Sequence, residues 1–315
     1  MTKHFFEFLR SGINTTLQDN GRDNLYHIGI PFSGAMDRRN YLIANYLVGK
    51  KNNEPAIEFA YQGPLIKFFG EKVLFAITGD VNFNIIRNNS NVEEGKCYQT
   101  YKLSSGDQID IQSTKKSVYG YLSINSNFVA DKSFGSYSIN TKAKIGANDG
   151  KKFENKDKIF FYKSDNDIFK KINYINFKFE KLRVIKGTNF EYFDEKSKKI
   201  FFEQSFKVTK LSDRMGMRLE GKNLENKVST NIKSEGLVKG VVQVPSDGNP
   251  IIMLADHGTI GGYPKIANVI SADLDKLVQM TPGSIIKFKQ VTLDEAEKLF
   301  KFYNLETNNL INQIS

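Results

Sequence analysis

The sequence has 315 residues, with 45 Lys and Arg against 35 Asp and Glu, and a formal net charge of +10. Hydrophobic residues make up 40% of the chain and aromatic residues 12%, which excludes a disordered protein and predicts a folded chain of two lobes. No run of five or more basic residues occurs, so the charge indicates a solvated lysine-rich surface and no nucleic-acid-binding arm. Such a surface also suits an acidic partner or an anionic substrate.

Three features predict a cytoplasmic protein that does not enter a membrane. Cys97 is the single cysteine, which excludes an internal disulfide and fits a reducing compartment. The opening segment MTKHFFEFLR is expected to be a first strand and not a signal peptide, because its apolar run is short and lacks a cleavage pattern. No stretch approaches the roughly 18 apolar residues of a membrane-spanning helix.

The predicted elements are mostly short strands separated by Gly, Asn or Pro, which favours β barrels or sandwiches. After the opening segment, the clearest strands are 73–78, 118–124, 158–162, 251–255 and 284–291. Few helices are expected. One covers 38–48, with Asp37 as N-cap and Gly49 as C-cap, and another follows a capping box of Thr292 and Glu295. The fold class is therefore mainly β with few helices.

An internal similarity predicts a duplication. Sliding the chain by 177 residues matches Glu58 to Glu235 and Gly63 to Gly240. The same offset places 73–80 near 250–257 and 103–109 over 280–286. We therefore expect an N-terminal lobe at 1–170 and a C-terminal lobe at 171–315, joined within the lysine- and asparagine-rich stretch 163–182.

Within the first lobe, the stretch GINTTLQDNGRDNLYHIGIPFSGAMDRRN (12–40) is polar and glycine-rich. Arg22 has the fork geometry to grip a carboxylate or an amide oxygen. Ser33 and Asp37 belong to a turn that delivers the N-terminus of the 38–48 helix, which can bind an anion. The alternative is structural, with Asp37 as a helix cap and Arg22 as an ion-pair partner.

Two further stretches carry candidate polar groups. Asp213 and Arg214 are neighbours in LSDRMGMRLEG (211–221), and Glu235 and Gln243 follow in SEGLVKGVVQVPSDGNP (234–250). Acid and arginine neighbours often only satisfy one another on a surface. We nevertheless interpret them as functional, because of the stretch that follows.

The stretch ADHGTIGGYPKIANVISADL (255–274) places ionisable groups at the end of an apolar strand. It contains Asp256, His257, Gly261, Gly262, Tyr263 and Lys265. The glycines permit close approach by a ligand, and an acid, a histidine and a lysine together can bind a carboxylate or phosphate and move a proton. The alternative is a well-bonded turn with a surface lysine.

Several motifs are missing from the sequence. It has no phosphate-binding loop, dinucleotide-binding GxGxxG, HExxH zinc motif or GxSxG nucleophile elbow, and no Met-Lys-Met site for carrying biotin. We therefore predict no metal ligands and no recognisable means for this chain alone to hold ATP.

The sequence resembles a known family. GINTTLQDNGR, PFSGAMD, EFAYQGP, LSDRMGMRLEG, SEGLVKGVVQVPSDGNPI and ADHGTIGGYPKIANVISADL occur in the order typical of the allophanate hydrolase subunit 2, or biotin-dependent carboxyltransferase, family. The resemblance covers 8–300 and, within that family, is closest to the C subunit of bacterial 5-oxoprolinase. It implies two cyclophilin-like β-barrel lobes.

The resemblance also implies a function. It points to one component of a hetero-oligomeric, ATP-dependent hydrolase that opens 5-oxo-L-proline to L-glutamate. The implied partners are the A and B subunits of that enzyme, with ATP bound alongside them and Mg able to accompany it. One alternative is a carboxyltransferase acting on urea-like amides, with biotin on another chain. The other is a regulatory protein that antagonises a kinase inhibitor.

For the hydrolase, we expect cations to bind and polarise anionic groups while acids or a histidine handle protons. The candidate catalytic residues are Lys265, Asp256, His257 and Asp213. The candidate substrate-binding residues are Arg22, Ser33, Asp37, Arg214, Glu235, Gln243, Gly261, Gly262 and Tyr263. Both lobes are expected to contribute to one shared groove.

Overall fold

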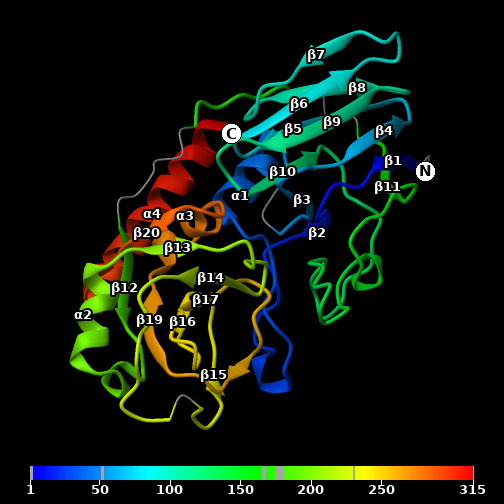
Figure 1. Ribbon diagram of the computed structural model, residues 1–315. Helices are drawn as coiled ribbons and strands as arrows, with labels where there is room; N and C mark the ends of the chain where they lie inside the picture. The colour runs from blue at the N-terminus through cyan, green and yellow to red at the C-terminus, as the bar shows by residue number, and fades with distance from the viewer. Residues whose placement is uncertain (1–2, 51–52, 165–167, 175–180, 230, 315) are drawn as a thin grey trace. The chain divides into compact units, whose positions relative to one another are not determined.

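The computed structural model describes residues 3–50, 53–164, 168–174, 181–229 and 231–314. The chain folds into two compact units, and both are discontinuous in sequence (Figure 1). Unit 1 comprises Met1–Arg22, Ser33–Ile175 and Thr307–Ser315, and unit 2 comprises Asp23–Phe32 and Asn176–Glu306. The predicted domains, 1–170 and 171–315, stay a prediction.

Unit 1 is built from two antiparallel sheets. The first has the order β11-β1-β4-β9-β6-β7, with β1 (Lys3–Arg10), β4 (Leu65–Phe69), β6 (Val81–Ile86), β7 (Val92–Glu94), β9 (Gln108–Thr114) and β11 (Lys158–Tyr162). The second has the order β2-β3-β10-β5-β8, with β2 (Thr16–Gln18), β3 (Ala56–Ala60), β5 (Lys72–Thr78), β8 (Thr100–Ser104) and β10 (Tyr119–Ile124).

Burial in unit 1 follows from which faces are covered. In β6 alternate residues are buried, as expected of a strand with one face on the core, and Phe83 at its centre packs in a large phenylalanine-rich cluster. Every residue of β3 and β10 is buried. Both strands are covered by α1 (Arg38–Leu47), which also packs on β5 (Figure 1).

The predicted starts of both helices are confirmed, while the C-cap of the first lies one residue before the predicted Gly49. The Asp37 carboxylate caps α1 by accepting a hydrogen bond from the Asn40 N–H at 3.0 Å. The helix ends at Leu47, with Val48 as the C-cap and Gly49 in the left-handed region (φ 77°) immediately after it. The Thr292 and Glu295 capping box also forms, at the start of α4 (Leu293–Ile314).

Unit 2 contains an eight-stranded sheet with the order β20-β13-β14-β17-β16-β19-β12-β21. Its strands are β12 (Leu182–Lys186), β13 (Phe206–Val208), β14 (Gly216–Glu220), β16 (Val241–Gln243), β17 (Ile251–Met253), β19 (Lys265–Val269), β20 (Ile285–Ile286) and β21 (Phe288–Gln290). A separate ribbon pairs β15 (Glu235–Gly236) with β18 (Ile260–Gly261). The remaining helices are α2 (Glu195–Glu203), α3 (Leu274–Val278) and the short turns η1 (Tyr26–Ile28), η2 (Asn148–Gly150), η3 (Phe190–Tyr192) and η4 (Ser271–Asp273), of which η2 lies in unit 1.

The stretch 284–291, predicted as one strand, is split in the structure. Its two halves, β20 and β21, are separated only by Lys287 and occupy the two ends of the sheet order. β20 pairs with β13, while β21 pairs with β12 in parallel. Because β20 and β21 follow one another in the chain but form the two edge strands of the sheet, the sheet curls into a nearly closed barrel. The mainly β fold class is thus confirmed.

No helix in the described part of the chain is both long enough and apolar enough to cross a bilayer.

Candidate functional site

Four strands of unit 2 bring Lys265, Gln243 and Glu235 together. Lys265 opens β19 and lies opposite Gln243 of β16, while Glu235 opens β15 opposite Gly261 of β18. The Lys265 Nζ donates a hydrogen bond to the Glu235 carboxylate. The Gln243 amide donates to the carbonyl of Tyr263 at 3.0 Å. These residues form what we call the Lys265 site: Lys265, Glu235, Gln243, Gly261 and Tyr263.

The ion pair in this site is unequally buried. The Lys265 side chain is 5% exposed, whereas that of Glu235 is 43% exposed. The Lys265 backbone is held by Asn189, whose side-chain oxygen accepts from the Lys265 N–H at 3.0 Å. The hydrogen bond from Lys265 holds the pKa of Glu235 below its ordinary value. A buried ammonium therefore faces a carboxylate that reaches water, and an anionic ligand could take the place of that carboxylate.

The turn after β17 is fixed by a second ion pair. Arg214 donates from Nε and Nη2 to the two carboxylate oxygens of Asp256, at 2.7 and 3.0 Å. Both side chains are buried, and the Asp256 N–H donates to the Arg214 carbonyl at 2.9 Å. Such bidentate geometry is strong and directional. It ties the end of β17 to the segment before β14.

His257 is buried beside a tyrosine that the sequence analysis did not select. Its Nδ1 lies 2.6 Å from the Gly258 carbonyl and its Nε2 lies 3.3 Å from the Tyr26 hydroxyl. Because a carbonyl only accepts, we assign the ring proton to Nδ1, which leaves Nε2 to accept from Tyr26. Burial lowers the pKa of His257 and raises that of Tyr26. The only signal for Tyr26 was its place in the polar stretch 12–40.

The remaining predicted residues of unit 2 shape the backbone. Asp213 is exposed, and its carboxylate accepts from the N–H groups of Met215 and Gly216 at 2.8 and 3.2 Å, as in a tight turn. The Gly262 carbonyl accepts from the Ile232 N–H at 2.9 Å. A Cβ on Gly261 would lie 2.7 Å from the Gln243 amide nitrogen, so a larger residue here would force the Gln243 side chain to move.

The three predicted residues of unit 1 are all buried. Arg22 donates to the Ser133 carbonyl at 3.1 Å and to the Ser138 carbonyl, and so clamps that loop. Ser33 has a left-handed backbone (φ 58°), and its hydroxyl accepts from the Asn140 amide at 3.2 Å. Asp37 caps α1. The shared groove expected from both lobes stays a prediction.

No group of three or more His, Cys, Asp or Glu side chains is placed to hold a metal ion within the residues that the structure describes.

Comparisons with known proteins agree with this fold. The family model of the carboxyltransferase domain, subdomain A and B, matches residues 28–290. The chain is 34% identical over 285 residues to the 5-oxoprolinase C subunit of Haemophilus influenzae, covering 90% of each chain. It is 26% identical over 318 residues to urea amidolyase of Saccharomyces cerevisiae, covering 93% of this chain and 17% of that protein.

A solved structure shows the same fold. The crystal structure of Kluyveromyces lactis urea carboxylase superposes with a TM-score of 0.87 at 24% identity, covering 97% of this chain and 29% of that one. Because the family model spans most of the chain, the protein belongs to the carboxyltransferase domain family, with subdomains A and B.

Proposed function

We propose that this chain is the C subunit of an ATP-dependent 5-oxoprolinase complex, which hydrolyses 5-oxo-L-proline to L-glutamate together with the A and B subunits. The observation that carries the proposal is the 34% identity to a protein named as the C subunit of 5-oxoprolinase, over 90% of both chains. The half-exposed ion pair of the Lys265 site supports it, since the substrate is a carboxylate.

The reaction needs a site that handles negative charge. A lactam resists attack by water because amide resonance is lost when water adds. ATP, bound with the partner subunits, supplies the phosphoryl group that removes this resonance. In our proposal Lys265 binds the anionic group of the substrate, and Glu235 turns to solvent when that group arrives. Lys265 is well suited because its backbone is fixed by Asn189 and its ammonium is buried.

Proton transfer is assigned to His257. With its pKa lowered by burial, its imidazole is neutral near pH 7 and can accept a proton at Nε2, where the Tyr26 hydroxyl now lies. Asp256 already accepts two bonds from Arg214, which favours a role in holding the loop for this pair. Four other predicted residues also have side chains that already make hydrogen bonds within the chain. We therefore assign them to holding the backbone in place: Asp213, Arg22, Ser33 and Asp37.

The first test uses the whole complex. The chain, purified with its partner subunits, should release glutamate from 5-oxoproline only when ATP is present. Lys265→Ala should reduce turnover about 10²- to 10³-fold, the loss typical of removing one charge-stabilising group. Lys207→Ala is the matched control, because Lys207 also pairs with a glutamate in unit 2 but both side chains are exposed. Undiminished turnover in Lys265→Ala would remove that residue from the site.

A second candidate function is a carboxyltransferase acting on a urea-like amide. The family description and the identity to yeast urea amidolyase favour it. A biotinylated carrier on another chain would then be required. Streptavidin blotting of proteins that copurify with this chain distinguishes the two, because a 5-oxoprolinase complex should retain no biotinylated partner and should be indifferent to urea.

A further inference from the structure

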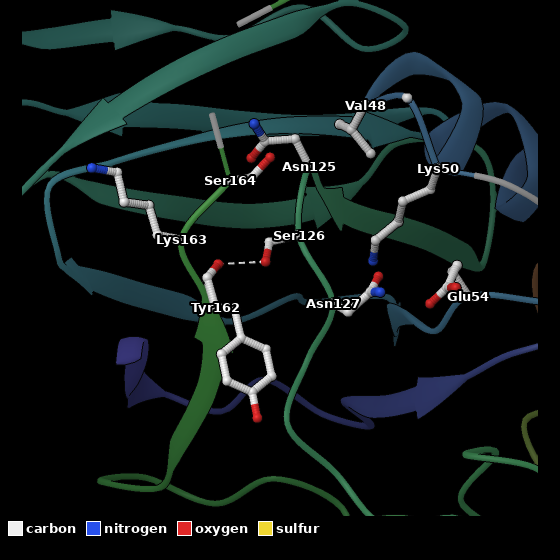
Figure 2. Close-up of a pocket in the computed structure, with 10 residues that line it drawn as sticks. Val48, Lys50, Glu54, Asn125, Ser126, Asn127, Tyr162, Lys163 and Ser164 are labelled. Carbon is white, nitrogen blue, oxygen red and sulfur yellow. Dashed lines mark hydrogen bonds between the residues drawn. The ribbon is translucent and has the colours of Figure 1, made fainter. Parts of the chain in front are cut away.

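Unit 1 contains a cavity of about 470 Å³, and none of the candidate site residues lines it. It lies between the turn after α1, the segment after β10 and the end of β11 (Figure 2). Its polar lining includes Lys50, Glu54, Asn125, Ser126, Asn127 and Lys163. The cavity thus offers amide and hydroxyl groups around one buried lysine.

The backbone of Lys50 is fixed by the way α1 ends. Gly49 takes the left-handed conformation, and the Lys50 N–H then donates to the Asn45 carbonyl at 2.9 Å. This is the pattern by which a glycine after a helix satisfies the last carbonyls. The end of α1 therefore fixes the Lys50 backbone at the edge of the cavity.

The amine of Lys50 is in an unusual environment. The residue is 7% exposed, its Nζ donates to the Pro55 carbonyl at 3.1 Å, and it lies 5.1 Å from the centre of the Phe128 ring. Within the described residues, that carbonyl is the one hydrogen-bond acceptor it meets. Burial lowers the pKa of Lys50 from 10.5 to about 7, partly opposed by the Glu54 carboxylate. A substantial fraction is therefore the neutral, nucleophilic amine near pH 7.

We propose that Lys50 captures a small aldehyde with a polar substituent, as a reversible imine, in this cavity. The nitrogen lone pair attacks the carbonyl carbon, and one proton passes from that nitrogen to the carbonyl oxygen to give a carbinolamine. Loss of that hydroxyl as water then forms the C=N bond, so that amine and aldehyde give imine and water. The Asn127 amide, which lines the cavity, suits the polar substituent. This site does not depend on the proposed 5-oxoprolinase function.

The charge beside Lys50 favours an imine over the other common adduct of a neutral amine. Carbon dioxide would convert the amine to a carbamate, which is an anion. Glu54 lines the same cavity and acts electrostatically on Lys50. Its carboxylate stabilises a protonated, cationic imine and repels a carbamate. The cavity is thus better suited to an aldehyde.

The experiment traps the imine in the full-length chain. Protein at pH 7 is incubated with glycolaldehyde or glyoxylate and cyanoborohydride, which adds hydride to the C=N carbon, and modified lysines are mapped by mass spectrometry. Lys158 is the internal comparison, because it lies 5.0 Å from the Phe5 ring in the same unit but is exposed. We expect Lys50 to be labelled at least ~10-fold faster than Lys158 at pH 7, with the preference shrinking toward pH 10 as ordinary lysines deprotonate.

Two variants complete the design. Lys50→Met should abolish the preferred label and Lys158→Met should leave it unchanged. If Lys50→Met does not fold, the comparison of Lys50 with Lys158 in the wild-type chain still tests the proposal. Because the Glu54 carboxylate repels an anion, glycolaldehyde should label Lys50 faster than glyoxylate, and the opposite order would contradict the role given to Glu54. Equal labelling of the two lysines, or no label on Lys50, would overturn the proposal. So would a ¹³C carbamate signal from Lys50 in bicarbonate with no trapped imine.

Discussion

Two ion pairs in unit 2 differ in how much of their charge faces water. Arg214 and Asp256 are both buried and share two hydrogen bonds. In the other pair Lys265 is buried, whereas the side chain of its partner Glu235 is 43% exposed. Breaking the first pair would leave an uncompensated charge inside the protein, which is strongly destabilising. The second pair can open when an anionic ligand replaces the carboxylate, because Glu235 regains water and the buried ammonium keeps a negative partner. Exposure therefore separates the pair suited to holding the loop from the pair suited to exchange with a ligand.

His257 should make stability depend on pH. Its pKa is below 6.5 in the folded chain because of burial, so the unfolded chain binds more protons as pH falls below that value. The contribution of His257 to the free energy of unfolding should therefore be constant above about pH 7 and decrease as pH falls through 6.5, by at most about 1.4 kcal/mol per pH unit for one proton. Urea denaturation between pH 8 and 5 measures this, and His257→Gln should flatten the curve in that window. An unchanged slope in the variant would assign the effect to other groups.

Variants of Asp37 test whether this residue caps α1 or binds the substrate. Its carboxylate accepts from the Asn40 N–H and side-chain amide, so Asp37→Ala should lower the free energy of unfolding by about 1 to 2 kcal/mol. Asp37→Asn retains a capping oxygen and should recover most of that loss, as urea denaturation can show. Turnover that is lost in Asp37→Asn despite normal stability would instead support direct substrate binding.

At the level of elements, the β15 and β18 ribbon positions the Lys265 site. Glu235 and Gly261 are paired in the ribbon, and Gly261 packs directly on Gln243 and Leu237. The sequence offset of 177 places 65–69 and 72–78 near two strands of unit 2, yet the pairing differs. β4 and β5 lie in separate sheets, whereas β16 and β17 are hydrogen-bonded neighbours.

The ribbon contains its own matched control. In Gly261→Ala the new Cβ would lie 2.7 Å from the end of the Gln243 side chain and 2.8 Å from that of Leu237, so these two buried side chains must move. We expect a loss of about 1 to 3 kcal/mol in the free energy of unfolding, and reduced turnover. Gly236→Ala, in the partner strand, meets nothing within 4 Å and should change stability by less than about 0.5 kcal/mol. Thermal melts that show equal effects would contradict the packing argument.

At the scale of the whole molecule, both units are assembled from distant segments. The end of α4 belongs to unit 1, where Ile314 packs in a cluster with Ile43 and Leu47. Residues 23–32 belong to unit 2, where Tyr26 contacts His257. Cutting the chain at one point between the units would therefore separate each unit from part of its own core or site.

The C-terminal residues should consequently stabilise unit 1. Ile314 is 4% exposed, and Ile314→Ala should lower the free energy of unfolding by about 2 kcal/mol through the cavity that it leaves. Gln313→Ala alters a neighbouring exposed position and should cost less than about 0.5 kcal/mol. Denaturation followed by tyrosine fluorescence compares them, and equal midpoints would argue that the terminus does not support unit 1.

The sequence by itself determined the features that depend on a few neighbouring residues. Short apolar segments separated by Gly, Asn or Pro predicted the β-rich fold, and the caps at Asp37 and Thr292 located the starts of two helices. Motif order also identified the family, and the polar stretch after β17 marked the candidate site. These signals are local, because strand periodicity and helix caps are set within a few positions.

Only the tertiary structure decided which of those polar groups meet, and how deeply. Lys265 contacts Glu235, which lies 30 residues away in the sequence, and His257 contacts Tyr26, which lies 231 residues away. The stretch 284–291 became two strands because its halves join opposite edges of one barrel. Lys50 gave no signal in the sequence, since its altered pKa arises from burial beside Phe128 and Pro55. Pairing and desolvation depend on the packed neighbours of a side chain, and those are set by the fold as a whole.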